Sequence, residues 1–90
     1  MRILAVCGVG LGTSAILKLN AERALERLGI DAEVLASDLA GATAAAVDAQ
    51  VVLTSTELAG RFDPGFAELV LIDNYVDLAE ITAKIEAALG

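Results

Sequence analysis

The side chains best suited to chemistry are concentrated in one short segment near the N-terminus, CGVGLGTS, at residues 7–14. Cys7 is the chain's single cysteine, three alternating glycines follow it, and Thr13 and Ser14 close the segment with two hydroxyls. A thiolate is a nucleophile, glycines let the backbone curl closely around a bound group, and hydroxyls donate hydrogen bonds to an anion. The segment therefore predicts a nucleophile beside an anion-binding loop.

A plainer interpretation of Cys7 is a small apolar side chain at the end of a buried strand. Free cysteines are often buried and then behave as small hydrophobic residues. However, Cys7 opens the glycine-rich segment and does not lie inside the apolar run Ile3–Val6 that precedes it. We therefore favour the nucleophile over the core residue.

Apolar and amphipathic segments alternate along the chain and predict the elements that must position this segment. Short apolar runs predict strands over residues 3–6, 32–36, 50–55 and 67–73. Helical spacing of apolar residues predicts helices over residues 14–28, 39–49, 56–62 and 77–89. Ser14 and Asp77 are the expected N-caps, and Gly29 is the expected end of the first helix.

Strands that alternate with helices in this way favour the α/β class. We expect a single three-layer domain whose four-stranded parallel sheet, in the order 2-1-3-4, is flanked by helices as in Rossmann-like or flavodoxin-like folds. Ligands bind such sheets beyond the carboxyl ends of the strands. Cys7 should lie at that edge, beside the N-terminus of the first helix, where free N–H groups and the helix dipole attract anions and lower a thiol's pKa.

Composition narrows the possible functions. A formal charge of −7 and a pI near 4.2 argue against a nucleic-acid partner, since binding phosphate backbones relies on Lys and Arg. The chain has no histidine, which excludes a histidine phosphocarrier, a Cys–His pair and a histidine metal site, so we expect no metal and no cofactor. One cysteine cannot form an intramolecular disulfide, and the apolar runs are too short for a membrane span or a signal peptide. A cytoplasmic protein that is not itself inserted in the membrane is expected.

The length of 90 residues and the lack of a linker-like stretch predict one domain over residues 1–90. The start at Met1 and the expected closing helix favour a complete small protein.

Other phosphate-binding patterns fit the segment less well. GVGLGT holds the first two glycines of the dinucleotide fingerprint, but Thr13 stands at its third position, and no lysine precedes Thr13 or Ser14 as in a Walker loop. The spacing also resembles the C-x5-R-[ST] loop of low-molecular-weight tyrosine phosphatases and arsenate reductases of similar fold. Here Thr13 replaces the arginine that clamps the phosphoryl group. The Asp63-Pro64 pair resembles that family's general acid, but it should lie at the opposite edge of the sheet, where a turn explains it better.

Residues 6–22, VCGVGLGTSAILKLNAE, resemble the enzyme IIB component of the bacterial sugar phosphotransferase system, most closely its ascorbate/galactitol side within the lactose/cellobiose superfamily. The loop of that family is C-G-x-G-x-[GA]-[ST]-S. The resemblance implies that a phosphohistidine of enzyme IIA phosphorylates the cysteine, which passes the group to a sugar at the membrane enzyme IIC. Cys7 matches the catalytic phosphocysteine, and the matching phosphate-binding residues are Gly8, Val9, Gly10, Leu11, Gly12, Thr13 and Ser14. A IIB-like regulatory module is a further alternative.

Other polar residues are expected at the same edge because they follow the second, third and fourth strands: Ser37, Asp38, Thr54, Ser55, Asp73, Asn74 and Tyr75. Each could contact a partner or cap a helix, and Asp73 is expected to orient the loop. Lys18, one turn past Ser14, is more simply a solvated side chain. Val9 and Leu11 are candidates for docking enzyme IIA.

Overall fold

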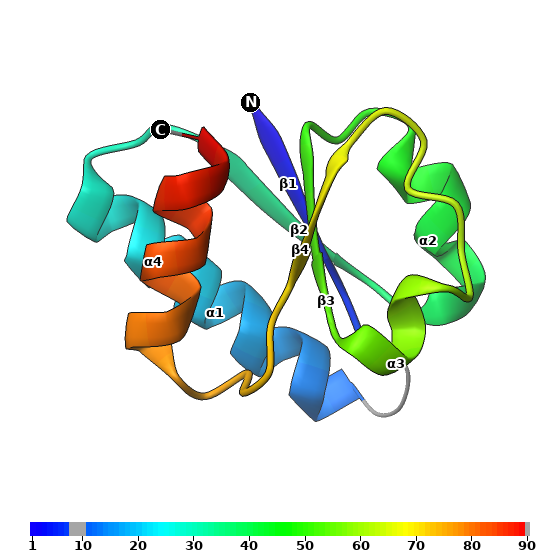
Figure 1. Ribbon diagram of the computed structural model, residues 1–90, viewed down its shortest axis with the longest axis horizontal. Helices are drawn as coiled ribbons and strands as arrows, with labels where there is room; N and C mark the ends of the chain where they lie inside the picture. Colours follow the sequence, from blue (N-terminus) through cyan, green and yellow to red (C-terminus); the bar gives the residue numbers. More distant parts are fainter. Residues whose placement is uncertain (8–10, 90) are drawn as a thin grey trace.

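Strands and helices alternate through the chain in the computed structural model, which describes residues 1–7 and 11–89 (Figure 1). The elements are β1 (Arg2–Val6), α1 (Leu11–Leu28), β2 (Glu33–Ser37), α2 (Leu39–Ala46), β3 (Val51–Thr54), α3 (Thr56–Ala59), β4 (Glu68–Leu71) and α4 (Leu78–Leu89). Their order and type agree with the sequence-based prediction. None of the described helices combines the length and the apolar character needed to cross a membrane.

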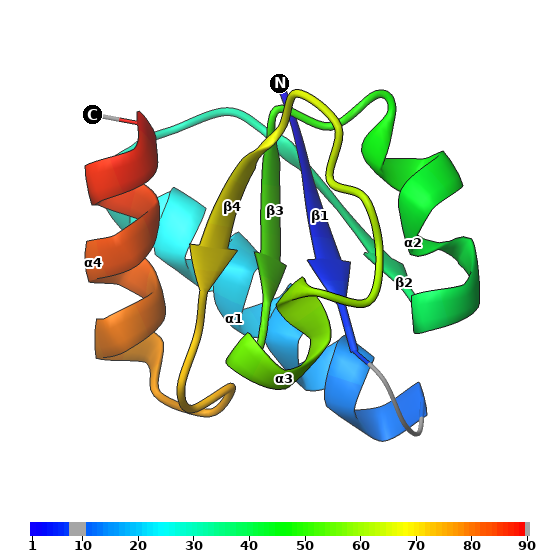
Figure 2. The ribbon, with the colours of Figure 1, turned by 45° about the vertical axis from the view of Figure 1, so that its right-hand side comes forward.

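The four strands form one parallel sheet in the order β2-β1-β3-β4, as predicted. The register places Leu4 of β1 beside Leu35 of β2 and Val52 of β3, and Val52 in turn beside Leu69 of β4. All four carboxyl ends therefore point to one edge of the sheet, where α3 also lies (Figure 2).

Helices cover both faces of the sheet: α1 and α4 lie on one side, and α2 lies on the other (Figure 1). Because successive side chains of a strand point to opposite faces, β1 contributes side chains to the core on both faces of the sheet. Ile3, Ala5 and then Cys7 join the cluster under α1 and α4, whereas Leu4 and Val6 pack with the alanines of α2. Cys7 continues the alternation of Ile3 and Ala5, so it lies on the face of the sheet that α1 and α4 cover.

The apolar residues that α1 buries are small or branched and bring the helix close to the sheet and to α4: Leu17, Ala21, Ala24 and Leu25. Gly29 ends this helix as predicted. Its φ of 69° is the left-handed conformation that glycine adopts without strain. Its N–H donates to the Glu26 carbonyl at 3.2 Å and the Ile30 N–H donates to the Leu25 carbonyl at 3.0 Å, which is a Schellman motif.

Some predictions about helix ends and faces were wrong. α1 begins at Leu11, so Ser14 lies inside the helix and is not its N-cap. Ile16, one of the apolar residues whose helical spacing predicted a buried face on this helix, is 44% exposed, whereas its neighbour Leu17 is buried. The second and third helices are shorter than expected and end at Ala46 and Ala59.

Aspartates cap the two helices that follow β2 and β4. Asp38 caps α2, because its Oδ1 accepts a hydrogen bond from the Gly41 N–H at 2.8 Å. The Ser37 hydroxyl instead donates to the Asp38 carbonyl at 2.9 Å, so the expected capping role of Ser37 is wrong. Asp77 caps α4 as predicted, accepting from the Glu80 N–H at 3.1 Å.

Candidate functional site

Cys7 lies directly after β1, at the carboxyl edge of the sheet where it was expected. Its backbone N–H donates to the Ser37 carbonyl at 3.2 Å, which continues the pairing of β1 with β2 by one residue. The side chain is 3% exposed and belongs to the core cluster between the sheet, α1 and α4. This burial agrees with the plainer interpretation of Cys7 as a core residue, so the surrounding polar groups decide what else the thiol can do.

The end of β1 is held in place by β3. Thr54 is fully buried, and its Oγ1 donates to the Val6 carbonyl at 3.1 Å. Val6 immediately precedes Cys7, so this bond fixes the backbone from which the thiol projects. Thr54 is thereby part of the support beneath the site.

Tyr75, the chain's only tyrosine, packs beside the cluster that holds the thiol. It follows β4, and its half-buried side chain lies against the core residues that include Cys7. The sequence placed Tyr75 at this edge but gave no reason to single it out from Asp73 and Asn74.

Asn20 on α1 holds Tyr75 from the other side, and the sequence analysis missed it. Its Nδ2 donates to the Tyr75 carbonyl at 2.8 Å, and the residue is only 8% exposed. The available signal was a polar residue on the buried stripe of α1, between Leu17 and Ala24, where an apolar side chain is the usual choice.

Electrostatics at Cys7 oppose ionisation of the thiol in this structure. Burial raises the pKa of the Cys7 thiol, and the hydrogen bond from Tyr75 lowers it by a smaller amount. Burial also raises the pKa of Tyr75, so the phenol stays protonated and can donate. The prediction of a lowered thiol pKa is therefore wrong here, because removal from water outweighs the donor.

The remainder of the glycine-rich segment is only partly described. Gly8, Val9 and Gly10 lie outside the described residues. The backbone of Leu11–Ser14 forms the first turn of α1. The N–H groups of a helix's first turn have no partner within the helix itself. The helix dipole favours an anion at that end. The phosphate-binding roles of residues 8–14, and docking by Val9 and Leu11, stay predictions.

The segment between β4 and α4 is anchored by Glu80. Its carboxylate accepts from the backbone N–H groups of Asp73 at 2.7 Å and Asn74 at 3.0 Å. Lys84 approaches the same carboxylate at 2.6 Å and lies 3.6 Å from the Asp73 carboxylate. The hydrogen bond from Lys84 and those from the backbone hold the pKa of Glu80 below its ordinary value. Glu80, which the sequence analysis did not select, thus fixes the segment that carries Tyr75.

Asp63, a further candidate from the sequence, has a structural role. The Asp63 carboxylate accepts from the Gly65 N–H at 2.8 Å, and its own N–H donates to Thr43 of α2 at 3.1 Å. Asp63 therefore belongs to a turn on the far face of the sheet, as the turn interpretation predicted, and not to a site with Cys7. Lys18 lies on α1 and is half-buried.

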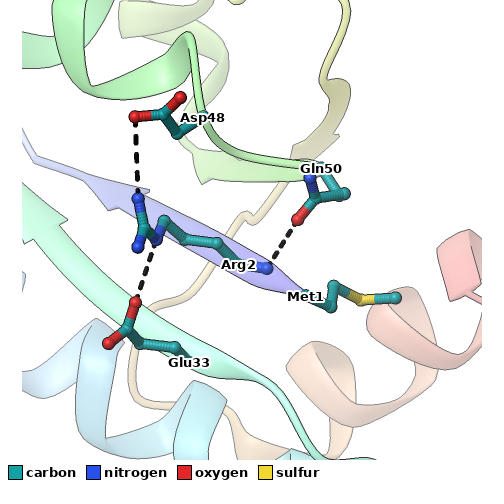
Figure 3. Close-up of a pocket in the computed structure, with 5 residues that line it drawn as sticks. All are labelled: Met1, Arg2, Glu33, Asp48 and Gln50. Atoms are coloured by element: carbon teal, nitrogen blue, oxygen red, sulfur yellow. Dashed lines mark hydrogen bonds and ion pairs between the residues drawn. The ribbon is translucent and has the colours of Figure 1, made fainter.

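A hollow of about 460 Å³ lies at the opposite, amino end of the strands (Figure 3). Arg2 crosses it, with Nε 2.9 Å from Glu33 Oε1 and Nη1 3.7 Å from Asp48 Oδ2, while the Arg2 N–H donates to Gln50 at 2.6 Å. Two carboxylates already neutralise this guanidinium. The hollow is therefore assigned a structural role, joining β1 to β2 and to the start of β3.

Comparisons with known proteins give a consistent picture. The family model "PTS system, Lactose/Cellobiose specific IIB subunit" matches residues 2–87. The ascorbate-specific PTS system EIIB component of Mycoplasma pneumoniae is 30% identical over 90 residues, covering 99% of this chain and 95% of that protein. Its Escherichia coli O157:H7 counterpart is 30% identical over 86 residues, covering 94% and 85%.

Among solved structures, the lactose-specific IIB domain of Streptococcus pneumoniae superposes with a TM-score of 0.61 at 16% identity, covering 99% of this chain and 94% of that one. At this identity the likeness concerns the fold alone. It agrees with the four-stranded parallel sheet and its strand order.

Proposed function

This chain belongs to the lactose/cellobiose-specific IIB family of the sugar phosphotransferase system, and we propose that Cys7 is the residue that carries the phosphoryl group. The observation that carries the proposal is the place of the thiol. It lies at the carboxyl edge of the sheet, between the end of β1 and the N-terminus of α1. That is where ligands bind parallel sheets of this kind, and where a helix N-terminus favours an anion.

The transfer consists of two substitutions at phosphorus. The Cys7 thiolate attacks the phosphorus of a phosphohistidine on enzyme IIA, so that the S–P bond forms while the N–P bond breaks and the imidazole nitrogen leaves with the electron pair. A sugar hydroxyl at the membrane enzyme IIC then attacks the same phosphorus. The O–P bond forms, the S–P bond breaks, Cys7 leaves as thiolate, and the hydroxyl proton is released to a base.

The first turn of α1 and the loop before it supply the stabilising donors in this proposal. Catalysis of phosphoryl transfer is chiefly positioning and electrostatic stabilisation of the equatorial oxygens. Backbone N–H groups of residues 8–14 and the hydroxyls of Thr13 and Ser14 are assigned that task. Thr13 stands where a phosphatase has arginine, so the loop holds the group without the cation that hydrolytic relatives use.

The substrate class and cellular place follow the relatives. Both curated relatives named above are ascorbate-specific, which supports an acidic sugar such as ascorbate over galactitol as the final acceptor. We place the chain in the cytoplasm as one IIB domain over residues 1–90, working between enzyme IIA and enzyme IIC without a cofactor.

Mass spectrometry tests this function directly. The chain is incubated with the phosphorylated enzyme IIA of an ascorbate-specific system, and a mass gain of one phosphoryl group that is lost in acid is expected. Cys7→Ser should abolish the gain, while the exposed control Thr56→Ala should retain it. Labelling that survives Cys7→Ser, or no labelling of the native chain, would contradict the proposal. Steady, Cys7-dependent turnover of p-nitrophenyl phosphate would instead assign a phosphatase.

A further inference from the structure

We propose that the outer edge of β4, formed by the backbone groups of Leu69 and Leu71, is a pairing surface for β4 of a second copy of this chain, and that Lys84 keeps it closed. The inference goes beyond the function proposed above and does not depend on it. It concerns self-association of the free chain and can be tested without any phosphoryl donor.

β4 is the last strand on its side of the sheet, so only its inner edge has a partner strand (Figure 2). The N–H groups of Glu68 and Ile72 donate at 2.9 and 2.8 Å to carbonyls just before β3 and at its end. Because the backbone groups of successive residues in a strand face opposite edges, those of Leu69 and Leu71 point away from β3. An unpaired edge of this kind is a template for a further strand.

Lys84 of α4 occupies one of these outward groups. Its Nζ donates to the Leu71 carbonyl at 2.7 Å, which agrees with a carbonyl that points away from β3. The same ammonium lies 2.6 Å from the Glu80 carboxylate and 3.6 Å from the Asp73 carboxylate, so three acceptors hold it against the strand. A charged side chain at a sheet edge opposes the addition of a strand, because the charge would have to give up its partners. Lys84 therefore closes the carboxyl end of the outer edge.

The rest of the outer edge is accessible. A hollow of about 430 Å³ lies along β4 beside α4, and residues 68–71, Lys84, Ala87 and Ala88 line it. The two alanines are short, so the last turns of α4 leave the strand uncovered there. Within residues 1–7 and 11–89, no side chain bonds the N–H or the carbonyl of Leu69, or the N–H of Leu71. Lys84 is thus the one described side chain that bonds this edge.

A second copy of β4 matches the groups that this edge offers. Two antiparallel strands related by a two-fold axis at Val70 place Leu69 of each chain opposite Leu71 of the other. Residues opposite each other in hydrogen-bonded positions exchange both of their bonds, so every outward N–H would meet an outward carbonyl. The same register places Glu68 opposite Ile72, so like charges do not meet across the pair. The edge is therefore complementary to itself once Lys84 releases the Leu71 carbonyl.

Sedimentation equilibrium of the free chain, at concentrations up to about 1 mM, tests the inference. The native chain should remain a monomer. Lys84→Met keeps an unbranched apolar side chain but removes the charge and the donor, and its average molar mass should rise with concentration towards twice that of the monomer. Lys18→Met removes the same charge from α1 and should stay monomeric. Adding Leu71→Pro to Lys84→Met removes an outward N–H without touching the bonds to β3, and should abolish the dimer.

Three outcomes would overturn the inference: a folded Lys84→Met chain that stays monomeric, a dimer that also forms in Lys18→Met or survives Leu71→Pro, and a species larger than a dimer. A native chain that already pairs would show that Lys84 does not close the edge.

Amide hydrogen exchange of the native chain is a second test, which needs no variant to fold. The N–H groups of Leu69 and Leu71 should exchange rapidly, whereas that of Val70, which faces β3, should be protected. Protection of Leu69 and Leu71 in the native monomer would show that the outer edge is already covered, and the proposal would fail. In Lys84→Met, the same two groups should gain protection as the dimer forms.

Discussion

Replacing Asn20 by alanine should destabilise the fold and loosen the site together. Asn20 Nδ2 donates a hydrogen bond of 2.8 Å to the carbonyl of Tyr75, which lies 55 residues further along the chain. Among the described residues, no other side-chain hydrogen bond joins α1 to the segment that carries Tyr75. The residue is 8% exposed, so water does not readily replace the amide once it is gone. Asn20→Ala therefore leaves the Tyr75 carbonyl without its donor.

The expected loss of stability combines the cost of the lost hydrogen bond with the gain in helix propensity from alanine. An unsatisfied buried carbonyl costs about 1–3 kcal/mol, and this contact is only partly buried, which favours the lower half of that range. Alanine regains roughly 0.5 kcal/mol through its better helix propensity. The net loss is about 0.5–1.5 kcal/mol, and a domain of this size loses roughly 4–8 °C in Tm per kcal/mol. We expect Tm to fall by about 2–12 °C.

Thermal unfolding followed by circular dichroism measures this loss. Glu22→Ala is the matched control, since Glu22 lies on the same helix and is exposed. Its Tm should stay close to that of the native chain. If Asn20→Ala lowers Tm no further than Glu22→Ala, the bond carries no stability and the reasoning is refuted.

Three further changes test other parts of the structure. Lys84 and backbone donors depress the pKa of Glu80, so Glu80 contributes stability at neutral pH that is lost as the pH falls through its folded pKa. Urea unfolding gives the free energy of unfolding at pH 7 and at about pH 4, and Glu80→Gln should make these two free energies more alike. The same difference between the two pH values in Glu80→Gln and in the native chain would contradict this. Thr54→Val keeps the shape but removes the bond to the Val6 carbonyl, and should cost about 1–2 kcal/mol in urea unfolding; a neutral result would show that Val6 needs no donor. Ile85→Val removes one methylene where α4 meets the core and should cost about 0.5–1.5 kcal/mol, measured the same way, with no loss expected if that contact is loosely packed.

Much of the architecture could be predicted from the sequence because its signals are local. Apolar runs and helical spacing identified the strands and helices of the described residues, and their alternation predicted the parallel sheet. The correct strand order was expected from the likeness to flavodoxin-like folds. Gly29 and Asp77 ended and began their helices as predicted, since such caps depend on residues within one turn. The position of Cys7 at the carboxyl edge followed from the same alternation.

Helix starts were less predictable because neighbouring residues compete for the same role. Ser14 is a good N-cap by type, yet α1 begins at Leu11 and encloses it. Ser37 and Asp38 are both suitable caps for α2, and only Asp38 places its oxygen on the Gly41 N–H. Residue type gives such a preference, while the path of the chain out of the sheet decides which residue occupies the cap.

The sequence by itself determined the fold class and the edge of the sheet at which Cys7 lies, and it singled out that cysteine as the residue we propose for the chemistry. Tertiary structure decided how that cysteine is surrounded. Tyr75 and Asn20 meet only because α1 packs beside the segment after β4, and neither residue lies in a motif. The direction of the thiol's pKa was also beyond sequence reasoning, because it depends chiefly on how much water the folded chain removes from Cys7.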